Sequence, residues 1–283
     1  METLKTETLL GDIAFGEGPR WRDNRLYFSD MHSQRVLAVD LQGRLEEICV
    51  VPNDPSGLGW LPDGRMLVVS MQDRKLLRLE TDGTLSEVAD LSELATFHCN
   101  DMVVDRQGRA YVGNFGWDLH GGGEPCGANL ILVEPGGDVR VAASDLGFPN
   151  GTVLTDDGGT MIIGETMAQR LSAFEVGEDG SLSNRREWAA CPGVLPDGIC
   201  LDAEGGVWVA SPTRNACFRM LEGGEITHQV DVQTDAFACM LGGPERRHLL
   251  ICTASSSEPE ACKANRDGQI EIVEVEVPGA GLP

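Results

Sequence analysis

The fold is decided by residues 195–211, which read LPDGICLDAEGGVWVAS. A short apolar strand is followed by a glycine turn and then by a second run of β-forming residues. The same pattern recurs five more times along the chain, at Glu17, Ser56, Asn100, Asn150 and Phe237. The second strands of the repeats begin roughly 40 to 51 residues apart, which is the spacing typical of propeller blades. The sequence therefore predicts a six-fold repeat.

Each repeat holds two further strands joined by glycine turns, such as TDG at 81–83 and PGG at 135–137. The sixth repeat is short by one strand, because residues 270–275 supply its third strand and PGAG follows at 278–281. The missing outer strand can come from residues 6–10, TETLL, which would remove an exposed sheet edge. We expect an all-β fold: a six-bladed β-propeller with four antiparallel strands per blade, closed by the N-terminal strand. A single domain over residues 1–283 is expected, and no segment carries a helix signal of confident length.

Composition limits the partners. The formal net charge is −23, which argues against nucleic acids and anionic membranes as partners. The nine cysteines show no CxxC spacing, and the first residues, METLKT, lack the apolar centre of a signal peptide. These features predict a reducing, cytoplasmic location and a small-molecule ligand.

The residues at the head of each first strand should crowd around the propeller axis, since first strands line the central channel. Four of these six side chains are oxygen donors: Glu17, Asn100, Asn150 and Asp197. Two carboxylates and two amides suit a hard cation such as Ca²⁺ or Mg²⁺, and Mn²⁺ accepts the same ligands. Without an ion, Glu17 and Asp197 would repel each other.

The alternative interpretation of Asp197 is an ordinary Pro-Asp-Gly turn. The chain offers its own comparison in residues 61–64, which also read LPDG. That copy lies between the first and second strands of its repeat, so Asp63 is expected to be a turn residue. The copy that contains Asp197 precedes a first strand and should lie at the channel mouth.

Three separated motifs carry a family resemblance: GEGP at 16–19, FPNG at 148–151, and PDG at 196–198 followed by WVA at 208–210. They resemble the signature segments of the SMP-30/gluconolactonase/luciferin-regenerating-enzyme family, and the likeness covers essentially the whole chain. The resemblance implies a six-bladed propeller with one axial divalent cation held at Glu17, Asn150 and Asp197. It implies that Asn100 touches metal or substrate. The usual activity in the family is hydrolysis of sugar lactones, and some relatives hydrolyse phosphotriesters.

Substrate contacts are expected from Asn100, His98, Trp117, His120 and Met167. Sugar-lactone members of the family often carry arginine where this chain has His98, so the lactone is not fixed as a sugar; a purely structural role for His98 stays open. Trp117 and His120 belong to a long glycine-rich connection at 113–125, and a second long connection spans 255–267. An apolar rim around the cation is expected from Phe15, His98, Trp117, His120, Met167 and Met240.

The predicted function is a metal-dependent hydrolase that opens a sugar lactone or a related small lactone. The cation, Ca²⁺ with Zn²⁺, Mg²⁺ or Mn²⁺ as alternatives, would polarise the carbonyl and activate water. Asp197 would be both ligand and general base. The alternatives are a phosphotriesterase or esterase at the same cation, a calcium-binding regulatory propeller without turnover, and an isomerase or lyase step. A nucleophilic serine is disfavoured because Gly-x-Ser-x-Gly is absent.

Overall fold

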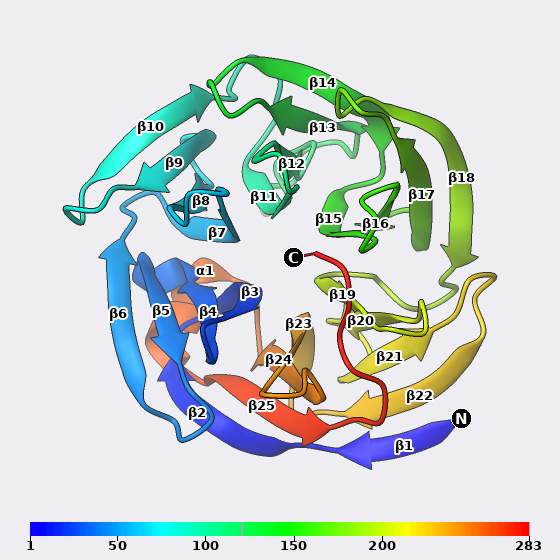
Figure 1. The fold of residues 1–283 in the computed structure, drawn as a ribbon. Coiled ribbons are helices and arrows are strands. Elements are labelled where there is room, and N and C mark those ends of the chain that lie inside the picture. Colours follow the sequence, from blue (N-terminus) through cyan, green and yellow to red (C-terminus); the bar gives the residue numbers. More distant parts are fainter. Residues whose placement is uncertain (120, 283) are drawn as a thin grey trace.

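The computed structural model describes residues 1–119 and 121–282. Its strands form six sheets arranged as blades around a central channel (Figure 1). The first three blades run outward from the channel as β3 (Gly16–Arg22), β4 (Arg25–Asp30), β5 (Arg35–Val39) and β6 (Leu45–Val50); then β7 (Pro55–Trp60), β8 (Met66–Ser70), β9 (Lys75–Leu79) and β10 (Leu85–Asp90); then β11 (Cys99–Val104), β12 (Ala110–Asn114), β13 (Ala128–Val133) and β14 (Val139–Leu146).

The other three blades follow the same order. They consist of β15 (Pro149–Leu154), β16 (Thr160–Glu165), β17 (Arg170–Val176) and β18 (Leu182–Ala190); then β19 (Ile199–Leu201), β20 (Val207–Ser211), β21 (Ala216–Met220) and β22 (Ile226–Asp231); then β23 (Asp235–Gly242), β24 (His248–Ala254), β25 (Gly268–Glu274) and β2 (Glu7–Ile13). The predicted all-β, six-bladed propeller is confirmed.

The ring is closed by the N-terminal segment, as the sequence predicts. Strand β2 pairs antiparallel with β25, with Glu7 opposite Ile272. The structure adds a strand that the sequence did not reveal: β1 (Glu2–Lys5) pairs in parallel with β22 of the fifth blade, with Glu2 opposite His228. The two N-terminal strands therefore cover the outer edges of two neighbouring blades, five and six.

The C-terminal tail crosses one end of the channel (Figure 1). Gly279 forms a β-bridge with Asp202, and Leu282 forms one with Leu154. Asp202 and Leu154 lie at the C-terminal ends of the inner strands β19 and β15. A ligand on the axis is therefore expected to enter from the opposite face, where the inner strands begin.

Close approach of the inner strands explains the glycines of the repeat. A Cβ atom at Gly57 would lie 2.4 Å from the backbone nitrogen of Met102, and one at Gly151 would lie 2.4 Å from that of Ile199. Both contacts fall on backbone of the next blade, which cannot move aside. On the four blades where glycine follows the strand-head residue (Gly18, Gly57, Gly151 and Gly198), it is required by the crowding of the blades around the channel.

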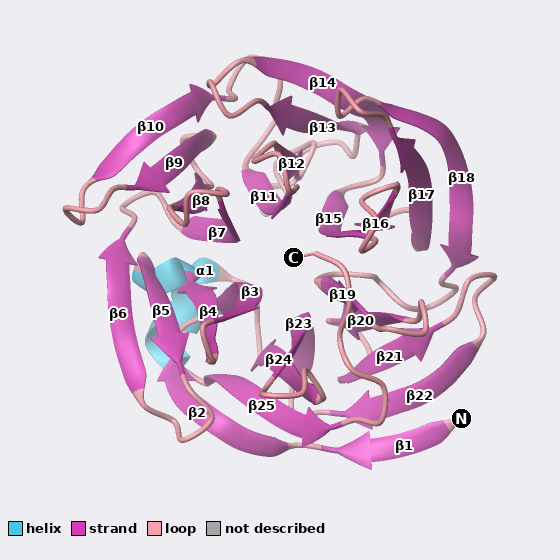
Figure 2. Cartoon of the chain, in the orientation of Figure 1, coloured by secondary structure: helices cyan, strands magenta, loops and turns pink. Residues whose placement is uncertain are grey.

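Two short helical segments lie among the strands (Figure 2). Helix α1 (Pro259–Asn265) lies in the long connection of the sixth blade, and a 3₁₀ turn, η1 (Met31–Ser33), lies in the first. Helix α1 begins with a proline and buries Cys262. Such a short helix depends on packing rather than on its own periodicity. Among the described residues, no helix is long and apolar enough to cross a membrane.

Candidate functional site

The predicted oxygen donors meet in one cavity of about 210 Å³ at the channel face opposite the C-terminal tail. Its lining includes all four of them: Glu17, Asn100, Asn150 and Asp197. All four are at least nine-tenths buried. The alignment of strand heads in the sequence therefore brings together side chains that lie on four different blades.

The inner strands place each donor in an equivalent position. Glu17, Asn100 and Asn150 are the second residues of β3, β11 and β15, and Asp197 stands two residues before β19. The backbone nitrogen of Asp197 donates to the carbonyl of Ala210 at 3.0 Å, which holds the residue against β20. Each side chain is consequently held at or just before the start of an inner strand.

Two of the donor oxygens are buried without any hydrogen bond: Oδ1 of Asn150 and Oδ1 of Asp197. The amide of Asn150 is oriented by its other end, because Nδ2 donates to Oγ1 of Thr166 at 3.2 Å. Thr166 in turn donates to the carbonyl of Pro196 at 2.7 Å. A buried oxygen without a partner is costly, and a cation bound beside it would remove that cost. The residues present therefore fit the cation that the family resemblance implies.

The pKa values of the two axial carboxyls also indicate a cation site. Burial raises the pKa of Asp197 to about 8, and the charge of Asp101 raises it as well, against the hydrogen bond from Asn150. Burial also raises the pKa of Glu17 well above its usual range, with added repulsion from Asp197 and Asp101. Both carboxyls favour the protonated state in the absence of a counter-charge, and a divalent cation would hold them ionised.

Arg20 and Asp101 form a buried ion pair that sequence reasoning missed. Nη2 of Arg20 lies 2.6 Å from Oδ1 of Asp101, and its Nε donates to the carbonyl of Leu58 at 2.9 Å. The pair therefore joins the first three blades close to the cavity. One signal was available: glycine follows the strand-head residue in four of the six repeats, and alanine follows it in the sixth. Only in the third repeat does a charged residue, Asp101, stand there.

The other expected substrate residues lie in different places. His98 and Met167 line the cavity, and the His98 ring stacks on Phe97 with centroids 4.1 Å apart. Trp117 is not among the lining residues; its ring packs edge-on against Phe148, 6.1 Å away. His120 lies outside the described residues.

The rim expected around the cation is apolar, but other residues build most of it. The rings of Phe15 and Phe237 are 4.6 Å apart, those of Phe115 and Phe148 are 4.7 Å apart, and all four line the cavity. Met240, on β23 of the sixth blade, instead packs into the hydrophobic core. Phe15 and Phe237 were expected here, as a rim residue and a strand-head residue. Phe115 and Phe148 were missed because each lies in an irregular segment between strands, where the two-residue period gives no direction.

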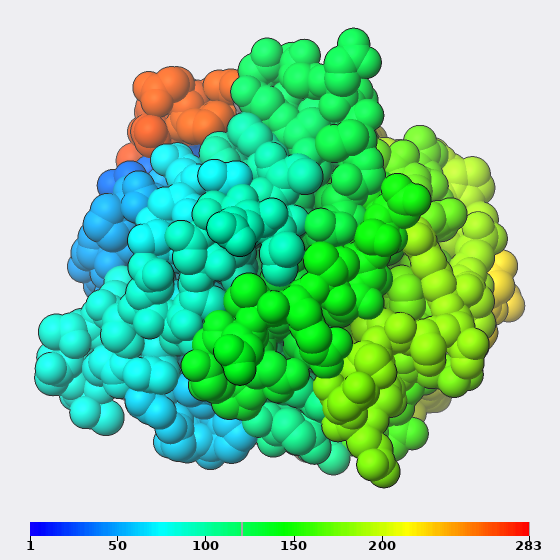
Figure 3. All heavy atoms as spheres, turned by 90° about the horizontal axis from the view of Figure 1, so that it is seen from above, coloured from blue at the N-terminus to red at the C-terminus, as the bar shows by residue number. Residues whose placement is uncertain are grey.

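Both long connections reach the mouth of this cavity. Leu119 of the third blade and Ser257 and Pro259 of the sixth are among its lining residues. Figure 3 shows the two segments, green and orange, projecting from the same face of the molecule. The long connections therefore flank the cavity, as functional loops of a propeller do.

His32 and Asp54 also line the cavity. Nδ1 of the His32 ring lies 3.3 Å from the carboxylate oxygen Oδ2 of Asp54. No motif spacing in the sequence connects His32 to Asp54, so the pair was not predicted.

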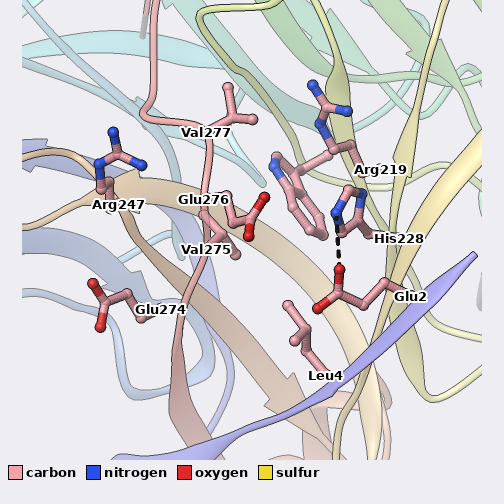
Figure 4. Close-up of a pocket in the computed structure, with 10 residues that line it drawn as sticks. Glu2, Leu4, Arg219, His228, Arg247, Glu274, Val275, Glu276 and Val277 are labelled. Atoms are coloured by element: carbon pink, nitrogen blue, oxygen red, sulfur yellow. Dashed lines mark ion pairs between the residues drawn. The ribbon is translucent and has the colours of Figure 1, made fainter.

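A larger cavity of about 510 Å³ lies at the outer rim, between the fifth and sixth blades (Figure 4). Its lining includes Glu2, Arg219 and His228. Glu2 pairs with His228 at 3.6 Å, and Arg219 pairs with Asp202 at 2.6 Å. Because these charges are already paired, the axial cavity with its unpartnered oxygens is the better candidate site.

No three His, Cys, Asp or Glu side chains of the described chain form a metal cluster. The axial set instead combines two carboxylates with two amides.

The fold and the site together define a six-bladed propeller with an oxygen-rich pocket on its axis. The sequence profile of the SMP-30/Gluconolactonase/LRE-like region matches residues 15–255, and the chain belongs to this family. The resemblance found from the three motifs is confirmed.

Several relatives span nearly the whole chain. A pentonolactonase of Haloferax volcanii is 27% identical and covers 95% of this chain and 92% of its own length. A 6-deoxy-6-sulfogluconolactonase of Pseudomonas putida is 26% identical and covers 100% of this chain and 98% of its own length. Among solved structures, the calcium-binding protein regucalcin of Agrobacterium tumefaciens superposes with a TM-score of 0.83 at 21% identity, covering 100% of this chain and 98% of that one.

Proposed function

We propose that this protein hydrolyses small lactones with the help of a divalent cation held by Glu17, Asn150 and Asp197. The observation that carries the proposal is the pair of buried, unpartnered oxygens on Asn150 and Asp197. Membership of a family with lactonase relatives supports the reaction type. The all-oxygen donor set favours Ca²⁺, and Mg²⁺, Mn²⁺ and Zn²⁺ are the ions to compare with it.

The residues divide the work as follows. When bound, the cation would polarise the lactone carbonyl and lower the pKa of a water molecule beside it. Asp197 accepts the proton of the attacking water, a task suited to a buried carboxylate beside the reacting atoms. Asn100, whose Oδ1 lies 3.4 Å from the hydroxyl of Ser56, can turn its amide hydrogens towards the developing oxyanion. The phenylalanine walls exclude other water from the reaction.

The test is a substrate panel on metal-stripped protein, with each ion added back separately. The panel contains sugar lactones, aliphatic lactones, an aryl lactone and a fluorophosphate. We expect lactone hydrolysis to disappear with the metal and to return with one or more of the ions. Hydrolysis of the fluorophosphate alone would favour a phosphotriesterase. Tight metal binding without turnover of any substrate would favour a binding protein and contradict the proposal.

A further inference from the structure

The wall of the axial cavity carries a histidine and a carboxylate that the proposed function does not yet use. His32 and Asp54 are 6% and 2% exposed, and both line the cavity. Nδ1 of His32 lies 3.3 Å from Oδ2 of Asp54. A paired imidazole and carboxylate, buried together in a ligand pocket, is an arrangement that moves protons in many enzymes.

Asp54 is held firmly in this position. Its Oδ2 also accepts a hydrogen bond from Nε2 of Gln72 at 2.9 Å, and its Oδ1 accepts one from Nε2 of Gln34 at 3.4 Å. Its backbone carbonyl accepts from the nitrogen of Met71 at 2.9 Å. The residue adopts a φ of 59°, in the left-handed region that aspartate tolerates better than most residues. The carboxylate is therefore a fixed point against which the histidine is set.

This setting determines which ring nitrogen of His32 faces the ligand. The carboxylate beside Nδ1 requires a proton on Nδ1, so the nitrogen left for other chemistry is Nε2. Nε2 has no hydrogen-bond partner within residues 1–119 and 121–282. The ring packs against Phe15, with centroids 5.4 Å apart, which opposes its rotation. With Nδ1 directed at Asp54, any proton that His32 donates to a ligand must come from Nε2.

His32 and Asp54 line the cavity from other blades than Asp197 does. His32 lies in η1 of the first blade, and Asp54 directly precedes the first strand of the second blade, β7. Asp197 precedes the first strand of the fifth blade, on the other side of the channel from the second (Figure 1). Because the cavity is only about 210 Å³, at the small end for ligand pockets, a lactone that fills it would contact both sides.

We propose that His32 is the general acid that protonates the leaving alkoxide of the lactone, and that Asp54 is its positioning residue. This inference rests on the proposed lactone hydrolysis. The water oxygen forms a bond to the carbonyl carbon, and its proton passes to Asp197. The bond between the carbonyl carbon and the ring oxygen then breaks, and the proton on Nε2 of His32 passes to that oxygen. The hydroxy acid leaves, Asp197 releases its proton to solvent, and His32 takes one up.

Two groups on opposite sides solve a problem that Asp197 alone would face. A single carboxyl would have to collect the proton from the water and then carry it to the alkoxide. An acid already placed beside the leaving oxygen removes that transfer. The need is greatest for an alkoxide, which is strongly basic, and small for a phenoxide, whose conjugate phenol has a pKa of about 10.

The leaving group therefore provides the test. His32→Gln and the unaltered protein are compared on δ-valerolactone, which releases an alkoxide, and on dihydrocoumarin, which releases a phenoxide from the same ring size. We expect kcat/KM of His32→Gln to fall by about 10²-fold or more on δ-valerolactone, and to stay within about three-fold on dihydrocoumarin. Asp54→Asn should show the same selectivity with a smaller loss, and it serves as the readout if His32→Gln does not fold.

His228→Gln is the matched control, because His228 pairs with Glu2 at the outer rim and is remote from the axis. It should leave both rates unchanged. Equal losses on the two lactones, or no loss on either, would overturn the role of His32. If the unaltered protein hydrolyses neither lactone nor any sugar lactone with any ion, it is the proposed function that fails, and the inference with it.

Discussion

Arg20 and Asp101 lie side by side, with Nη2 and Oδ1 2.6 Å apart and side chains only 4% and 6% exposed. Asp101 is close enough to the axial carboxyls to raise the pKa of both Glu17 and Asp197. Arg20 is thus the fixed positive charge of a site that gathers three carboxylates. We expect this charge to stabilise the folded site when no cation is bound.

Removing this charge should destabilise the whole propeller. Arg20→Met leaves Asp101 buried and unpaired, and we expect a loss of about 3–5 kcal/mol in the free energy of unfolding. Urea denaturation of metal-free protein measures it. The double variant Arg20→Met/Asp101→Leu should recover part of the loss, because it leaves no uncompensated charge. A single variant within about 1 kcal/mol of the unaltered protein would show that the ion pair contributes little.

The raised pKa of Asp197 predicts an unusual pH dependence for the metal-free protein. Its pKa is about 8 in the folded state against an ordinary 3.8, so the folded state binds more protons than the unfolded state between these values. The stabilisation is complete below the unfolded pKa and is lost as the pH rises through the folded one. We expect the melting temperature of metal-free protein to fall between about pH 4 and pH 8.

Saturating cation should abolish this fall, since a bound cation holds the carboxylates in the charged state. Asp197→Asn should reduce it in metal-free protein, leaving the part due to Glu17. Scanning calorimetry at several pH values, with and without cation, measures the melting temperatures that test this. A melting temperature that rises over this range in metal-free protein would contradict the electrostatic description of the site.

The N-terminal strands should be essential for stability. Deletion of residues 1–10 removes β1 and most of β2, which exposes the outer edges of the fifth and sixth blades. We expect the melting temperature to fall by roughly 10 °C or more, equivalent to several kcal/mol in a chain of this size. Deletion of residues 1–5 removes only β1 and should cost less. Unchanged stability after the longer deletion would mean that the ring does not depend on this closure.

His98 should control the choice of lactone. Its ring stacks on Phe97 at the cavity wall, where an arginine would present a charge and several donors instead. We predict that His98→Arg shifts the substrate ranking towards polyhydroxylated or anionic lactones and leaves metal affinity unchanged. Identical rankings for the two proteins across the panel would count against a substrate contact at this position.

The six-bladed fold could be predicted from the sequence because the same packing constraint acts in several repeats. Glycines such as Gly57 and Gly151 are dictated by the crowding of inner strands, so they mark the strand heads and align the residues before them. That alignment brought Glu17, Asn150 and Asp197 to one point. The parallel pairing of β1 was not predictable, because residues 2–5 form a short edge strand whose partner is set by where β2 begins.

The rest of the site depends on tertiary packing. His32 and Asp54 are 22 residues apart and lie on neighbouring blades, and only the curvature of the ring makes them neighbours. Helix α1, Phe115 and Phe148 belong to connections between strands, which have no regular period. Arg20 could not be paired with Asp101 until the first and third blades were placed around the second.

Asp63 and Asp197 provide the most direct test of the whole account, because both occupy a Leu-Pro-Asp-Gly tetrapeptide. The Asp63 side chain is 50% exposed and pairs with Arg65, whereas Asp197 is buried in the axial cavity with an unpartnered oxygen.

Glu17→Gln and Asn150→Ala should mainly weaken metal binding, so excess cation should restore part of their rates.

The decisive measurement is the rate of lactone hydrolysis by Asp197→Asn at saturating cation, beside Asp63→Asn. We predict that Asp197→Asn stays slower by about 10²-fold or more, because a ligand oxygen remains but the base is gone. Asp63→Asn should stay within a few-fold of the unaltered protein. Full recovery of Asp197→Asn with added cation would reduce Asp197 to a ligand. Equal losses at Asp63 and Asp197 would contradict the assignment of the site itself.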